Sequence, residues 1–232
     1  MDRKRIVMAT FAIAGLSYVS PIFAQSEEKE PKFQATLYGG LYVNNENAWT
    51  LEPNFSWQFH KYIGISAGLE CTRQYNQPNR SITFNGTKAE LTDNEVNVAW
   101  IIFKPSVVFY SPDIWHTKDK DKHLWFQAEP GISIGTPFHN SLTYEVKAFN
   151  GNIGKTVDYV TFRNKGLRCI YWNARASVNF SIDEFVIGAG YAVSDLDYYS
   201  GRRNVTLPDG GKFWVPKKEI SQYFFLSLGY KF

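Results

Sequence analysis

The chain has 232 residues, of which 44% are hydrophobic and 17% are aromatic, and its formal net charge is +3 at pH 7. Residues 1–24 carry three basic side chains and one acidic one, so their removal lowers that charge to +1. The remaining chain has no basic excess that points to nucleic acid, and its length fits one domain. Beyond residue 24 no window offers the ~20 apolar residues of a membrane-spanning helix.

The first 24 residues have the pattern of a secretory signal peptide. A basic start, MDRKR, precedes the apolar run IVMATFAIAGLSYV, and Ala24 stands before the polar Gln25. We expect cleavage after Ala24; the alternative is an uncleaved anchor helix, for which the apolar run is short. Residues 25–32, QSEEKEPK, are predicted to form a flexible leader. Residues 33–232 then form the exported domain.

Eight segments of that domain alternate apolar and polar residues with a period of two, which is typical of β-strands between two different environments. The second segment shows the pattern best: every odd position from Trp49 to Phe59 is apolar, and every even position from Thr50 to His60 is polar. Each segment has about the length that a tilted strand needs to cross a bilayer, ~9–11 residues. The eight segments are approximately 33–44, 49–60, 63–72, 99–110, 124–135, 170–180, 184–194 and 222–232.

The connections between these segments alternate in length, as short periplasmic turns and long outer loops do in outer-membrane barrels. Two connections depart from the rule: the first outer loop is very short, and 111–123 is long for a periplasmic turn. Inside one long loop, 142–149 and 156–162 are predicted to pair as a surface hairpin. The short connections are 61–62 and 181–183, and the long ones are 73–95, 136–168 and 195–219.

Two features indicate that the apolar face contacts lipid and is not buried inside a soluble barrel. The polar face is rich in glycine and serine, which suits the narrow interior of an eight-stranded barrel. The apolar face carries aromatic residues near the strand ends, where membrane–water interfaces favour them: Trp49, Trp57, Phe59, Phe180, Tyr191 and Tyr230. We therefore predict an all-β fold, an antiparallel up-and-down eight-stranded transmembrane β-barrel.

Charged residues occur on the inward face of five successive strands: Glu52, Glu70, Lys104, Glu129 and Arg175. Buried charges are tolerable only when they are paired. The alternation of acid and base predicts a luminal ion-pair network and a plugged interior. A gated or selective polar channel is the alternative reading of the same residues.

Few residues suggest catalysis or metal binding. His116 and His123 flank a charged run that is expected to be a solvated turn, and Cys71 and Cys169 lie on strands too far apart for a disulfide. His139 and Ser141 vaguely resemble the HxSN segment of outer-membrane lipid A deacylases. However, Leu142 replaces the asparagine of that motif. We predict no catalytic site, no metal site and no cofactor.

The last segment, QYFFLSLGYKF, ends on an aromatic residue and carries a continuous apolar face, made of Phe224, Leu226, Leu228, Tyr230 and Phe232. It resembles the terminal strand of bacterial outer-membrane β-barrel proteins. That resemblance implies that these residues are a C-terminal signal read by the barrel-assembly machinery. In architecture, 33–232 also resembles the small OmpA- and OmpX-type barrels and the porin-like outer-membrane barrels.

This resemblance implies a location in the outer membrane of a Gram-negative bacterium, with membrane lipid and lipopolysaccharide as partners. The basic part of the last loop, with Arg202, Arg203, Lys212, Lys217 and Lys218, is a candidate for contact with lipopolysaccharide. We expect a protein that is not an enzyme, whose long loops make surface contacts or stabilise the envelope. A narrow porin for small solutes or apolar ligands is the alternative, and a lipid A-modifying hydrolase is a third hypothesis.

Overall fold

The computed structural model describes residues 32–43, 48–75, 81–93, 97–117, 122–138, 140–150, 153–164, 166–208 and 210–232. In these residues the regular structure consists of two antiparallel sheets and α2 (Ser200–Arg203), a single helical turn. None of the helices described is long and apolar enough to cross a bilayer. The predicted signal peptide, 1–24, and all but the last residue of the leader lie outside the described residues.

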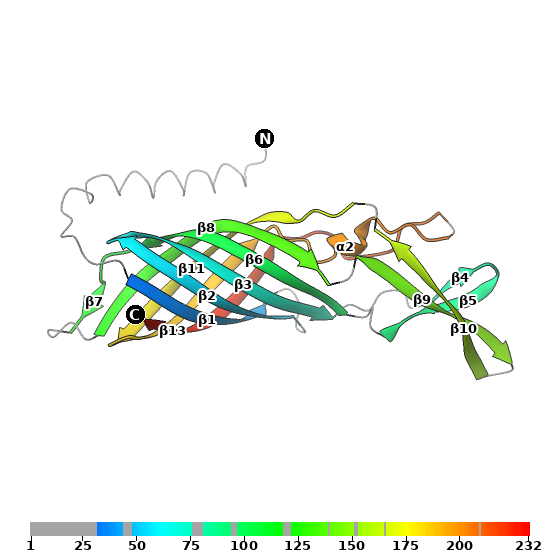
Figure 1. Ribbon diagram of the computed structural model, residues 1–232, viewed down its shortest axis with the longest axis horizontal. Helices are drawn as coiled ribbons and strands as arrows, with labels where there is room; N and C mark the ends of the chain where they lie inside the picture. Colours follow the sequence, from blue (N-terminus) through cyan, green and yellow to red (C-terminus); the bar gives the residue numbers. More distant parts are fainter. Residues whose placement is uncertain are drawn as a thin grey trace.

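Eight strands pair antiparallel in chain order, and the last returns to the first, so that the larger sheet closes into a barrel (Figure 1). In the closing pair, Leu37 of the first strand lies opposite Leu228 of the last. All eight predicted strands are confirmed, with differences of a few residues at their ends. They are β1 (Lys32–Tyr42), β2 (Trp49–His60), β3 (Ile63–Tyr75), β6 (Asn97–Tyr110), β8 (Lys122–Pro137), β11 (Ile170–Ile182), β12 (Phe185–Ser194) and β13 (Ser221–Lys231).

The barrel wall is apolar outside and polar inside. On β2, Phe55 is 66% exposed, whereas the adjacent Asn54 is 2% exposed. In water this arrangement would be inverted, because apolar burial is the main favourable contribution to folding. An apolar band on the outside of a closed barrel is the arrangement that lipid stabilises. The fold is a transmembrane β-barrel, as the alternation predicts.

Aromatic residues gather on the outer surface near the end of the barrel where the two termini of the wall meet. Phe33 stacks on Trp57 with ring centroids 6.0 Å apart, and Phe185 meets Tyr230 edge to face at 5.3 Å. Such rings are favoured at membrane–water interfaces because they are amphipathic. This cluster marks one edge of the apolar band.

The two ends of the barrel differ, and we refer to them as the short-turn end and the long-loop end. The short-turn end holds the tight β2–β3 and β11–β12 connections, the start of β1 and the end of β13. It also holds the connection after β6, in which β7 (Trp115–His116) pairs with β8. Within the long connection expected at 111–123, residues 115–116 thus form a short additional strand at this end.

A second sheet lies beyond the long-loop end (Figure 1). It contains β4 (Ser81–Phe84), β5 (Thr87–Leu91), β9 (Ser141–Asn150) and β10 (Ile153–Arg163), in the order β10-β9-β5-β4. We call it the outer sheet. The predicted surface hairpin is confirmed as β9 and β10, but β4 and β5, which complete this sheet, were not expected from the sequence.

Candidate functional site: a filled lumen beneath an outer sheet

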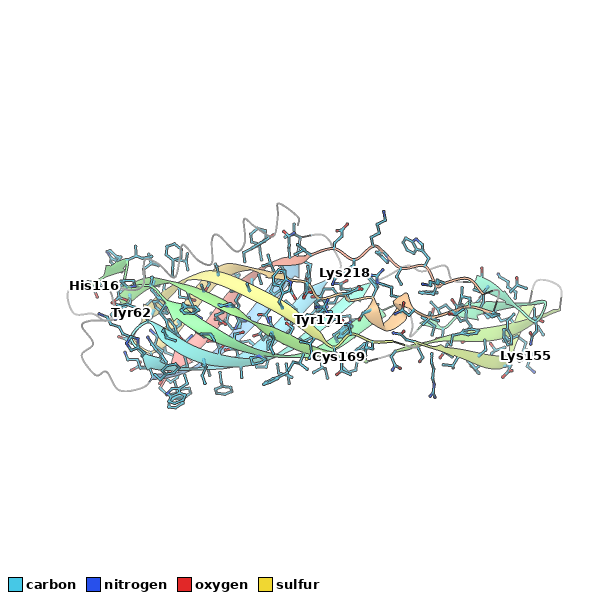
Figure 2. The ribbon with its side chains drawn as sticks, turned by 90° about the horizontal axis from the view of Figure 1, so that it is seen from above. Tyr62, His116, Lys155, Cys169, Tyr171 and Lys218 are labelled. Atoms are coloured by element: carbon cyan, nitrogen blue, oxygen red, sulfur yellow. The ribbon has the colours of Figure 1, made fainter. Side chains whose placement is uncertain are left out.

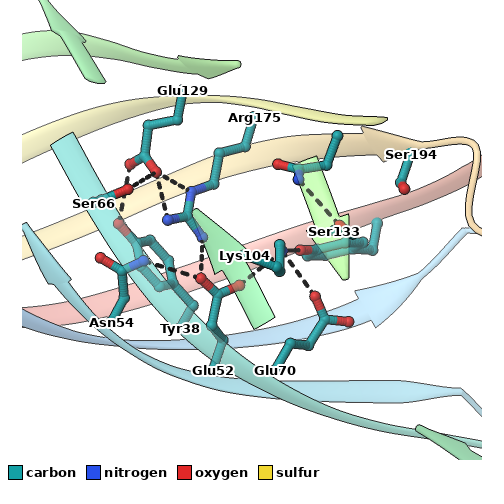
Figure 3. A network of polar contacts seen from close by, with 12 residues as sticks. Tyr38, Glu52, Asn54, Ser66, Glu70, Lys104, Glu129, Ser133, Arg175 and Ser194 are labelled. Carbon is teal, nitrogen blue, oxygen red and sulfur yellow. Dashed lines mark hydrogen bonds and ion pairs between the residues drawn. The ribbon is translucent and has the colours of Figure 1, made fainter. Parts of the chain in front are cut away.

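The five inward charges meet inside the barrel (Figure 3). The Lys104 Nζ atom lies 2.8 Å from Glu52 Oε2 and 2.8 Å from Glu70 Oε2. Arg175 Nη1 lies 2.8 Å from Glu52 Oε1, and Arg175 Nε donates to Glu129 Oε2 at 2.7 Å. Glu52 therefore joins the two cations, and five strands of the wall are linked through one network.

Neutral donors occupy much of the remaining hydrogen-bonding capacity of these carboxylates. Tyr42 donates to Glu70 at 3.1 Å and Tyr38 to Glu129 at 3.3 Å. The Arg175 guanidinium also lies over the Tyr38 ring, 4.0 Å from its centroid. Asn54, Ser66 and Gln127 contribute further donors. These polar residues, which the charge pattern alone did not indicate, make it possible to bury five charges without an unpaired one.

Glycines leave the room that this network and its neighbours need. A Cβ atom on Gly68 would lie 2.2 Å from Glu52 Oε1, and one on Gly190 would lie 2.3 Å from the backbone oxygen of Ala176. Contacts this short are not possible, so any larger residue at either position requires the wall or the network to move. The small residues of the inward face thus have the role that the sequence suggested.

Aromatic side chains fill the lumen between the network and the long-loop end. Trp100 and Tyr198 are both buried, and Trp100 Nε1 donates to the Tyr198 backbone oxygen at 2.9 Å. The Tyr198 hydroxyl is also hydrogen-bonded to that of Tyr42. Tyr198 belongs to the connection between β12 and β13, so this connection enters the barrel mouth. The cavity left beside Lys104 and Arg175 has a volume of about 10 Å³, about that of one water molecule.

Helix α2 and its flanks fix this connection in place. Arg203 forms a forked pair with Asp197, at 2.7 Å and 2.8 Å, and donates to the Pro216 oxygen at 3.0 Å. Arg202 is 2% exposed and donates to the Asn97 oxygen at 3.0 Å. These two arginines therefore hold the loop together; Arg202 is buried, and Arg203 is partly exposed. Of the predicted basic set, the exposed members are Lys212, Lys217 and Lys218.

The same connection continues onto the outer sheet and supplies part of its core. Leu142 and Tyr144 of β9 are fully buried, and they pack in one cluster with Val205 and Phe213 of the connection. Phe213 N donates to the Val205 oxygen at 3.0 Å, which holds the two residues side by side. The outer sheet therefore has a hydrophobic core of its own, separate from the barrel.

The opposite face of the outer sheet is polar. Lys147 and Lys88 both pair with Glu90, and the hydrogen bond from Lys147 is the main reason that the pKa of Glu90 falls to about 2. Thr143 and Thr161 are hydrogen-bonded across β9 and β10 at 3.2 Å. A sheet with one apolar and one polar face is the ordinary arrangement at a water-exposed surface.

Of the pair that resembles the HxSN segment, Ser141 begins β9 in the outer sheet, and His139 lies outside the described residues. Glu145, the nearest acid that follows Ser141 in the sequence, accepts a hydrogen bond from Thr156. No group of His, Cys, Asp or Glu suited to a metal ion occurs in the described ranges. Cys71 and Cys169 are free.

The predicted terminal signal lies on the outer face of β13. Its five residues, Phe224, Leu226, Leu228, Tyr230 and Phe232, are all exposed, and the Phe232 amide donates to the Phe33 oxygen at 2.8 Å. These side chains therefore project outward from the seam at which the barrel closes. Whether the assembly machinery reads them stays a prediction.

No protein-family model and no curated protein matches the chain. Solved structures do resemble it. The N-terminal barrel of Pseudomonas aeruginosa OprF matches with 8% identity and a TM-score of 0.37, over 90% of this chain and 100% of that one. Ail of Yersinia pestis matches with 12% identity and a TM-score of 0.40, over 88% and 99%. Neisserial surface protein A matches with 10% identity and a TM-score of 0.37, over 87% and 96%.

The fold is that of the small eight-stranded outer-membrane barrels. This statement rests on the strand pairing and the inverted polarity of the wall. Similarity at these levels carries no information about activity. The function must therefore be argued from the lumen and the outer sheet.

Proposed function

We propose that the protein resides in the outer membrane of a Gram-negative bacterium and holds a folded sheet at the cell surface for contact with other molecules. In this orientation the long-loop end faces outward and the short-turn end faces the periplasm. The observation that carries the proposal is the outer sheet with its own hydrophobic core, in which Tyr144 and Leu142 are fully buried. Loops that serve only to connect strands do not need such a core.

The filled lumen supports a role at the surface and not one in transport. Ion pairs link Glu52, Lys104 and Arg175 across the barrel, and aromatic residues fill the space above them. A path for solutes would require these buried charges to separate, which is costly in a medium of low dielectric constant. We therefore propose a barrel that is closed at rest.

Exposed aromatic and aliphatic side chains on the outer sheet and on the connection before β13 are candidates for contact with other molecules. Tyr159 on β10 is 61% exposed, Val157 beside it is 58% exposed, and Trp214 in the last connection is 60% exposed. These residues lie beyond the barrel wall, so lipid does not account for their exposure. Tyrosine and tryptophan are enriched at protein interfaces, which favours a binding role.

Conductance in planar bilayers tests the closed barrel. The refolded protein is expected to give no stable current steps, under conditions in which a general porin added as a positive control conducts. Reproducible steps from the wild-type protein would overturn this part of the proposal and favour the narrow channel.

Adhesion of cells tests the surface role. Cells that produce the wild-type protein are expected to adhere to surfaces or to one another, and the variant with Tyr159→Ser and Trp214→Ser is expected to lose this property. Thr83→Ser, on the exposed side of β4, is the matched control. Equal adhesion by both variants, together with detergent sensitivity of cells that lack the protein, would favour envelope stability instead. Mass spectrometry of lipid A tests the third hypothesis, a lipid A hydrolase. We expect the same lipid A in cells with and without the protein.

A further inference from the structure

The short-turn end of the barrel contains a hollow that the lumen and the outer sheet do not use. It has a volume of about 160 Å³ and lies between the ends of β1, β2, β6, β8 and β13. Its lining includes Lys32, Lys61, Asp113, Trp125 and Lys231. We call it the short-turn cavity. Figure 2 labels Tyr62, another lining residue, at this end, on the opposite side of the molecule from Lys155.

The cavity collects positive charge. Three lysines line it: Lys32, Lys61 and Lys231. Among the described lining residues Asp113 is the one acid, and its carboxylate lies 3.1 Å from His123 Nδ1. Bringing like charges together is unfavourable unless a counter-charge lies between them. The cavity therefore has an excess of cations over acids.

One residue of the cavity lining has a buried hydrogen-bond donor without an acceptor. Trp125 is 6% exposed, and its Nε1 has no partner among the described residues. The indole N–H can only donate, so only an acceptor can satisfy it. Buried donors without a partner are rare in folded proteins. The Lys231 ammonium lies 4.2 Å from the centroid of the same ring, so the free donor and the cation belong to one place.

Other polar groups around the cavity are already engaged, which limits where a ligand would bind. Gln34 donates to Thr36 at 2.8 Å, and Gln58 donates to the Lys61 backbone oxygen at 2.8 Å. The lining thus offers the Trp125 indole N–H, the Lys231 ammonium beside the same ring, and two further lysines. An acceptor with more than one negative charge matches a lining that combines a free donor with several cations.

We propose that the short-turn cavity binds a phosphate group, held by Lys32 and Lys231 and by a hydrogen bond from Trp125 Nε1. The oxygens of a phosphate accept in several directions, and its charge exceeds that of a carboxylate, which suits a lining with three lysines. The group is either inorganic phosphate from solution or the phosphomonoester headgroup of a lipid. The inference does not depend on the proposed surface role.

The indole resonance of Trp125 in NMR spectra of the refolded protein is the most direct test. In phosphate-free buffer, addition of phosphate is expected to shift this resonance with a saturable curve, whereas acetate at the same ionic strength leaves it in place. Lys231→Gln is expected to weaken phosphate binding at least tenfold, measured by calorimetry. Lys155→Gln, a lysine change at the far end of the outer sheet, is expected to leave it unchanged.

A second experiment distinguishes the two sources of the phosphate group, dissolved phosphate and a lipid headgroup. Nanodiscs of phosphatidylcholine with and without phosphatidic acid are compared in phosphate-free buffer. A shift with phosphatidic acid identifies a lipid headgroup, and a shift only with dissolved phosphate identifies the free ion; both support the site. No shift with either, an equal shift with acetate, or equal binding by Lys231→Gln overturns it. Heat-modifiable mobility on gels verifies that each variant is folded.

Discussion

Removal of Arg175 tests whether the luminal network is as interdependent as its geometry indicates. In Arg175→Met the aliphatic bulk remains, but Glu129 loses its cationic partner, and the donors left to it are the neutral Tyr38, Ser66 and Gln127. Glu52 keeps its 2.8 Å contact with Lys104 and is affected less. Breaking a buried ion pair by removing one partner destabilises proteins by about 3–5 kcal/mol, and we expect a loss of that size.

A second change separates the lost pair from the lost packing. Adding Glu129→Gln to Arg175→Met removes the uncompensated charge, so the double variant is expected to be more stable than Arg175→Met alone. The two single changes are then strongly non-additive, as neighbours in one network are. Arg175→Lys keeps the charge but loses the forked geometry. Its free energy of unfolding should therefore lie between that of the wild type and that of Arg175→Met.

The free energy of unfolding is measured by urea titration of protein in phospholipid vesicles, followed by tryptophan fluorescence and by gel mobility without boiling. Coincident transitions from both probes justify a two-state treatment. The reasoning is refuted if Arg175→Met costs less than about 1 kcal/mol, the upper range of an exposed ion pair. It is also refuted if the double variant loses the sum of the two single losses.

Three further predictions concern the seam, the wall and the outer sheet. Phe232→Ser is expected to lower the amount of heat-modifiable barrel in cells but not refolding in detergent, and equal losses in both would refute an assembly signal. Gly190→Ala should destabilise the barrel by about 1–3 kcal/mol because the added carbon meets backbone of β11 at 2.3 Å, whereas Gly39→Ala, with open space around it, should be neutral in the same urea titration. Because Glu90 has a folded-state pKa of about 2, below its ordinary value, its stabilising effect is present above the ordinary pKa and is lost as pH falls towards 2. Protease resistance of the outer sheet should therefore decline slightly more over that range in the wild type than in Lys147→Met, and identical pH profiles would contradict this.

The barrel could be predicted from the sequence because its rule is local. A strand between lipid and a narrow interior must alternate at every residue, so Phe55 and Asn54 reveal their faces without knowledge of their neighbours. The inward charges follow from the same alternation. The alternation does not give the relative heights of residues on different strands along the barrel axis. The contacts of Glu52 with both Lys104 and Arg175 depend on those heights.

The outer sheet could be predicted only in part because its core is assembled from distant segments. Ala89 of β5 pairs with Val146 of β9, and Phe213 of a third connection belongs to the same hydrophobic cluster. One local signal was present in the sequence, the pair Asn85-Gly86 between β4 and β5. Both residues have positive φ angles in the structure, 48° and 75°. An Asn-Gly pair at this spacing is the strongest short-range indication of a hairpin.

The connection before β13 has a consequence for the order of assembly. It is the last long segment of the chain before the closing strand, and its Tyr198 fills the barrel mouth while its Val205 and Phe213 complete the core of the outer sheet. Neither the mouth nor the outer core is complete until this segment is in place. A barrel halted before its final strand pairs is therefore both an open hole in the membrane and an exposed apolar surface. Closure of the seam, blockage of the lumen and burial of the outer core are then parts of a single terminal event.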